Sequence, residues 1–93
     1  MQITFTEEQT KTINRLAEKF ISGNDDPVEI YHTTFMKRVF DDKPEVIAIF
    51  KYTGCPNTMA YVAGVQLTES EFNDIENNTD WLFSKFVERL TNK

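Results

Sequence analysis

The stretch Glu45–Leu67 reads EVIAIFKYTGCPNTMAYVAGVQL and predicts two paired β-strands. Its two ends, Glu45–Tyr52 and Met59–Leu67, are nearly continuous runs of apolar residues. Runs of this kind, separated by Gly, Pro and Asn, are typical of buried strands joined by a turn. We therefore expect an antiparallel hairpin with its turn at residues 53–57. Gly64, inside the second strand, indicates either a bulge or a close backbone approach.

Two periodicities fit the preceding segment, Val28–Phe40, which reads VEIYHTTFMKRVF. Asp26 as a cap and Pro27 at the first helical position would suit a helix. The β-branched and aromatic residues, followed by a turn at residues 41–44, would suit a strand. Because a hairpin of only two strands is marginally stable, we favour a third strand from about Ile30 to Phe40.

Helices are predicted on both sides of the strands. Thr6 begins T-E-E-Q, a capping box in which its hydroxyl accepts a backbone N–H while Gln9 reaches back. One apolar stripe follows at helical spacing: Ile13, Leu16, Ala17, Phe20 and Ile21. Gly23 is expected to end this helix.

A second capping box, T-E-S-E, begins at Thr68 and is closed by Glu71. Asn77–Asp80 favours an interruption, because Asn, Thr and Asp compete for backbone hydrogen bonds. We expect two helices, at about residues 69–76 and 80–91, with one fused helix as the alternative.

The element order is α-β-β-β-α-α, which predicts a single α+β domain over residues 1–93, with its helices on one face of a three-stranded antiparallel sheet. Strand order is left open. The element order resembles that of double-stranded RNA-binding domains, which bind RNA through a basic helix N-terminus. Because Glu69 and Glu71 stand at that position here, the resemblance implies topology and not RNA binding.

Few residues are suited to chemistry. Cys55 and His32 are the only cysteine and histidine, and their spacing gives no reason to pair them as nucleophile and base. Residues 74–85 resemble a calcium loop, but Thr79 replaces the required Gly and Lys85 the closing Glu. We therefore expect no enzyme activity, no catalytic residue, no cofactor and no metal site.

The composition also bears on location and partners. The N-terminus lacks a basic start followed by an apolar run, and no stretch approaches the ~18 apolar residues of a membrane span. We expect a cytoplasmic protein, in the host cytoplasm if it is phage-encoded, with no membrane contact. A net charge of −5 disfavours direct nucleic-acid binding and favours a basic protein partner.

Negative charge is segregated in the C-terminal part of the chain. No Lys or Arg occurs between Lys51 and Lys85, a region that contains five acids. The helix dipole explains acids in a first turn, as for Glu69 and Glu71, but explains later ones less well. On one continuous helix, Glu69, Glu76 and Asp80 would lie along a single line. The predicted partner-binding residues are Glu69, Glu71, Asp74, Glu76 and Asp80, with Trp81 as an apolar anchor.

Two functions follow as hypotheses. In size, acidity and layout the chain is similar to small acidic inhibitors among toxin-immunity proteins and phage-encoded anti-restriction or anti-CRISPR proteins. That similarity implies a nucleic-acid mimic that blocks the basic surface of a nuclease or another nucleic-acid-binding enzyme. The alternative is a structural or assembly domain that forms a homodimer through its apolar sheet.

Overall fold

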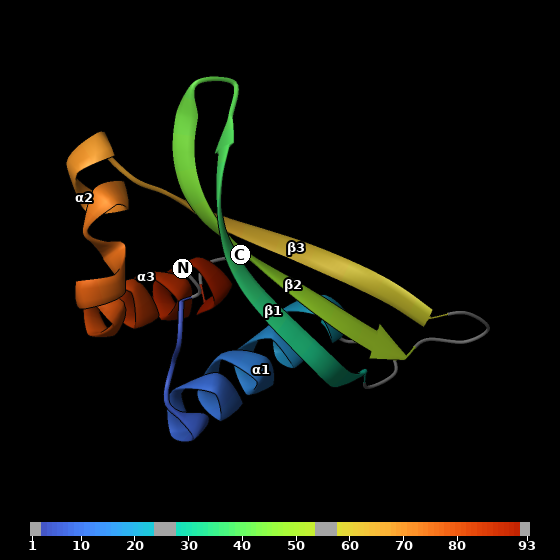
Figure 1. Cartoon of the computed structure of the whole chain (residues 1–93). Helices are drawn as coiled ribbons and strands as arrows, with labels where there is room; N and C mark the ends of the chain where they lie inside the picture. The colour runs from blue at the N-terminus through green and yellow to red at the C-terminus, as the bar shows by residue number, and fades with distance from the viewer. Residues whose placement is uncertain (1–2, 24–27, 54–57, 92–93) are drawn as a thin grey trace.

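Three antiparallel strands form a meander in the computed structural model, which describes residues 3–23, 28–53 and 58–91 (Figure 1). β1 (Glu29–Phe40) pairs with β2 (Lys43–Thr53), and β2 pairs with β3 (Thr58–Gln66). The predicted α+β class is confirmed, and so is the strand assignment of the ambiguous segment. Its helical alternative is wrong because β1 pairs with β2 along almost its whole length.

The β1–β2 turn is shorter than predicted. Only Asp41 and Asp42 lie outside the strands, with φ of 55° and 61°, and the expected turn residues Lys43 and Pro44 belong to β2. Positive φ at both central residues is the geometry of a two-residue type I′ turn. β3 pairs with β2 only from Glu45 onward, so the end of the hairpin extends beyond the sheet (Figure 1). We call this projection, residues 39–44, the hairpin arm.

Gly64 does not form the bulge that was one of its two predicted roles. The β2–β3 register runs unbroken through Gly64, which lies opposite Ile47, whereas the register shift of this sheet lies in β1 between Ile30 and His32. A Cβ atom at position 64 would meet the Glu45 carboxylate at 3.0 Å. The close approach is therefore made by a side chain rather than by backbone. The predicted turn at 53–57 falls mostly on residues 54–57, outside the described residues.

α1 (Glu7–Ser22) begins and ends as its sequence predicts. Both hydrogen bonds of the Thr6–Gln9 capping box are present at 3.0 Å, and Gly23, with a φ of 55°, closes the helix. Two hydrogen bonds fix α1 to β1. Thr33 Oγ1 donates to Asn14 Oδ1 at 2.7 Å, and the Ile30 amide donates to a Glu18 carboxylate oxygen at 2.9 Å.

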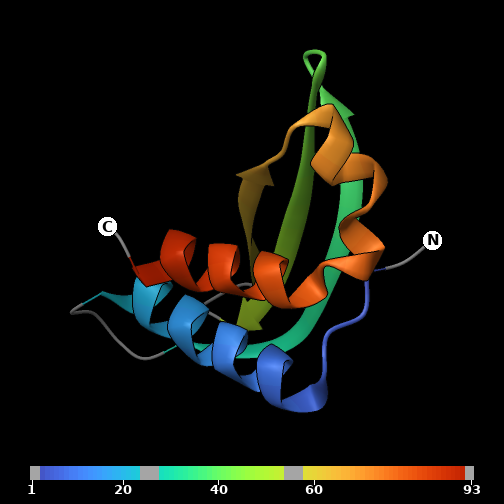
Figure 2. The same cartoon turned by 90° about the vertical axis from the view of Figure 1, so that its left-hand side faces the viewer.

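The C-terminal region is interrupted, as predicted. Thr68 caps α2 (Glu69–Asn73), a short 3₁₀ turn η1 (Ile75–Asn77) follows, and α3 (Thr79–Thr91) is the last of the described elements. α3 lies beside α1, whereas α2 and η1 run in a different direction along the sheet (Figure 2). The single fused helix is wrong, because the Asn-rich junction breaks it.

The helices pack on one face of the sheet and enclose an aromatic core (Figure 2). Ile3 and Phe5, which precede the first capping box, are also buried, and sequence reasoning did not include them. The Phe5 ring lies 4.7 Å from Phe35 on β1 and 6.3 Å from Phe86 on α3, both edge to face. The N-terminal segment therefore joins the sheet to the last helix.

Candidate partner-binding surface

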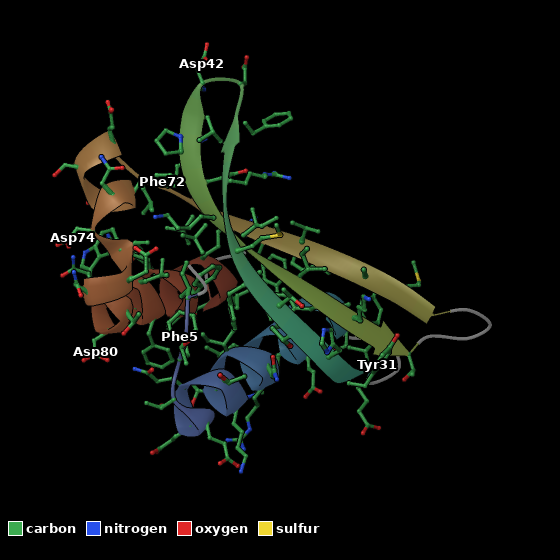
Figure 3. All side chains as sticks on the ribbon, in the orientation of Figure 1. Phe5, Tyr31, Asp42, Phe72, Asp74 and Asp80 are labelled. Carbon is green, nitrogen blue, oxygen red and sulfur yellow. The ribbon has the colours of Figure 1, made fainter. Side chains whose placement is uncertain are left out.

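Four of the five predicted acids lie on α2, η1 and the first turn of α3, and Asp74 lies at the junction between α2 and η1. Because these elements change direction, Glu69, Glu76 and Asp80 do not form the straight line expected on one helix. Asp74 and Asp80 point away from the sheet, whereas the neighbouring Phe72 points toward the hairpin (Figure 3). Residues 68–80, which we call the acidic segment, thus have an outward side and a side that faces β1.

Glu76 faces the sheet, where it forms an ion pair with Lys37 of β1. The two groups lie 3.1 Å apart, and their side chains are only 18% and 21% exposed. Lys37 Nζ also lies 4.4 Å from the centroid of the Phe72 ring, close enough for a cation–π contact. A hydrogen bond from its own backbone amide, followed by the one from Lys37, holds the pKa of Glu76 below its usual value of 4.5. Glu76 therefore contributes to the fold and is not part of the outward surface.

Three further acids accept hydrogen bonds from neighbouring groups. Glu71 accepts from the Thr68 amide at 2.8 Å in the capping box. Asp74 accepts from the side-chain amides of Asn77 and Asn78 at 2.8 and 3.1 Å. Asp80 accepts from the side-chain amide of Gln9 at 2.8 Å, which links α3 to the start of α1.

Three of the predicted acids, Glu69, Asp74 and Asp80, are exposed, and we call these three residues the acidic surface. Glu71 is half-buried. Trp81, predicted as an apolar anchor, is also half-buried and packs against the core, with Lys85 Nζ 5.5 Å from its ring centroid. The structure therefore leaves three of the six predicted residues, all of them acids, exposed to solvent.

A groove that sequence reasoning missed lies between the hairpin arm and α2. Its volume is about 520 Å³. It is lined by Val39, Asp42, Pro44, Leu67, Thr68, Glu69, Phe72 and Asn73. Val39 and Phe40 at the end of β1 are 62% and 64% exposed. The sequence did contain an indication of this groove: two apolar residues, Val39 and Phe40, stand directly before a tight turn. Side chains at such a strand end have few neighbouring strands to cover them.

Few of the described residues are suited to catalysis or metal binding. Cys55 lies outside them, and His32 is exposed on β1 with its ring 3.0 Å from the Thr34 hydroxyl. Within residues 3–23, 28–53 and 58–91, no group of three metal-ligating side chains occurs, and no helix is long and apolar enough to cross a membrane.

No known protein family, curated protein or solved structure matches the chain. The function is therefore inferred from the chain's own surface.

The pairing of Glu76 predicts a pH-dependent contribution to stability. Because its folded-state pKa is lowered, Glu76 adds stability above its unfolded pKa, near 4.5, and loses it as the pH falls through the lower folded value. Glu76→Gln should destabilise the protein at pH 7, and the variant should lose less unfolding free energy than wild type between pH 6 and about pH 3. Urea denaturation at each pH measures the unfolding free energy of wild type and of the variant.

The matched control is Glu69→Gln, which removes an exposed carboxylate without a hydrogen bond or ion pair in the described part of the chain. Between pH 6 and about pH 3, Glu69→Gln should lose as much unfolding free energy as wild type does. If Glu69→Gln and Glu76→Gln gave the same pH dependence, the Lys37–Glu76 pair would have no special role in stability.

Proposed function

We propose that this chain is a small, non-enzymatic binding protein whose acidic surface occupies a basic surface of a partner protein. The partner class that fits is a nuclease or another enzyme that handles nucleic acid, because such enzymes present Lys and Arg to bind phosphates. Carboxylates at Glu69, Asp74 and Asp80 would compete for those side chains. The chain would then act as an inhibitor in the cytoplasm.

One observation supports this proposal most strongly: the exposed acids keep their charge unneutralised. Among the described residues, Lys37 is the only cation that forms an ion pair with residues 68–80, and its partner is the inward-facing Glu76. No Lys or Arg is present in the sequence between Lys51 and Lys85. A surface of one sign attracts an oppositely charged partner and accelerates association in a salt-dependent way.

The acidic surface is also held in place before binding. Asp74 accepts two side-chain amide hydrogen bonds, and Asp80 accepts one from Gln9 on another helix. Side chains that are already ordered lose less conformational entropy when a partner binds. These hydrogen bonds leave both carboxylates exposed, so they can meet a partner's guanidinium or ammonium group.

Neutralising the acidic surface should weaken partner binding. In the variant Glu69→Gln, Asp74→Asn and Asp80→Asn, we expect about a tenfold or greater loss of affinity for a partner captured from lysate, mainly at low salt. The measurement is a binding isotherm at two salt concentrations. The control, Glu8→Gln, Glu29→Gln and Glu88→Gln, changes the net charge equally at exposed acids elsewhere.

The control should bind like wild type. Equal losses in the two triple variants would mean that only net charge matters, and unchanged affinity in the first variant would contradict a partner-binding role for this surface. Circular dichroism of each variant verifies that the fold is retained.

A second candidate function, a homodimeric assembly domain, is favoured by the uncovered face of the sheet. Met36 lies opposite Ile47, and Ile49 lies opposite Val62, on the face away from the helices. Met36 and Val62 are 43% and 46% exposed. Apolar side chains grouped on one open sheet face are typical of an interaction surface.

For this candidate, light scattering should show a dimer of the wild-type chain at about 100 μM and a monomer for Val62→Lys, because a charge on the sheet face would be buried unpaired. Val39→Lys is the matched control, since it changes an exposed valine on the hairpin arm. A wild-type monomer at concentrations near 1 mM would exclude this assembly.

A further inference from the structure

The groove between the hairpin arm and α2 combines apolar walls with charge of a single sign. Val39 and Pro44 form one wall, and Leu67 and Phe72 line the other side. The two charged residues that line the groove, Asp42 and Glu69, are both acidic. Its volume, about 520 Å³, lies within the roughly 300–1,000 Å³ typical of ligand-binding clefts.

Both walls of the groove are tied to the sheet. The Leu67 amide donates to the Pro44 carbonyl at 3.0 Å, which joins the entry to α2 to the base of the hairpin arm. Phe72 lies under Lys37, whose ammonium group also holds Glu76. The groove is therefore formed by elements with fixed positions, and a partner would not have to order them on binding.

The chemistry of the lining identifies the occupant. Lys and Arg side chains lay their aliphatic stems on apolar surface while their charged ends reach toward acids. An acidic segment would be repelled by Asp42 and Glu69, and a purely apolar segment would leave these carboxylates without a counter-ion. We propose that the groove binds a segment of the basic partner in which a leucine-sized side chain adjoins a lysine or arginine.

This inference rests on the proposed function and adds an apolar anchor to it. Glu69 belongs both to the groove and to the acidic surface, so a single partner could contact the two. Binding energy at protein interfaces concentrates in a few anchors in well-packed pockets, with charged groups around them contributing specificity. The groove would receive an apolar anchor from the partner, whereas the sequence-based prediction made Trp81 an anchor on this chain.

The test uses the full chain, labelled with ¹⁵N, and three synthetic peptides. Leucine alternates with arginine in the first, serine with arginine in the second, and leucine with glutamate in the third. We expect the leucine–arginine peptide to shift the amide signals of Val39, Leu67 and Phe72, and to bind at least fivefold more tightly than either of the others. Titration by NMR gives each dissociation constant.

Variants test whether the apolar wall matters. Val39→Ser should weaken binding of the leucine–arginine peptide at least fivefold, whereas Tyr31→Ser, at an exposed residue near the other end of β1, should leave it unchanged. Because both side chains are exposed, the fold should survive either change, and unchanged spectra outside the site would verify this.

Several outcomes would overturn the inference. Equal affinity for the serine–arginine peptide, or no effect of Val39→Ser, would mean that charge alone attracts the peptide; the groove would then have no role, while the proposed acidic surface would stand. Absence of binding by every peptide would also exclude the groove, and the triple variants above would still test the proposed function separately. Concentration-dependent shifts at the groove without peptide would assign it to a second copy of this chain.

Discussion

The ion pair between Lys37 and Glu76 is the constraint on which the acidic surface and the groove depend. Lys37 extends from the helix-covered face of β1, places its ammonium group 3.1 Å from Glu76 and lies over the Phe72 ring. It thereby fixes α2 and η1 beside the hairpin, and so positions both walls of the groove. Lys37 is the one described cation that forms an ion pair with residues 68–80. Among the described residues, Glu69, Asp74 and Asp80 therefore have no ion-pair partner.

Local patterns in the sequence were sufficient to predict most of the fold. Both capping boxes form between residues three apart, so Thr6 and Thr68 marked their helix starts without knowledge of the tertiary structure. Apolar runs identified β2 and β3. The ambiguous first strand was resolved by requiring a third strand to support a hairpin, and the Asn-rich junction correctly predicted a break near Thr79.

Features that depend on distant residues could not be predicted in this way. Glu76 looked like the other acids because its partner, Lys37, lies 39 residues away in sequence. Phe5 was overlooked because nothing near it signals that Phe35 and Phe86 surround its ring. Of the predicted acids, Glu69, Asp74 and Asp80 remain exposed, and the groove depends on the length of the hairpin arm beyond β3.

The most direct measurement of the central claim is amide hydrogen exchange in Lys37→Met, which removes the charge of Lys37 and keeps most of its apolar stem. If the Lys37–Glu76 pair fixes the acidic segment to the sheet, amides of α2 and η1 should exchange faster in the variant, while those of α1 and α3 change little. Unchanged exchange in α2 and η1, or equal acceleration in every element, would contradict the claim that this pair positions the surface.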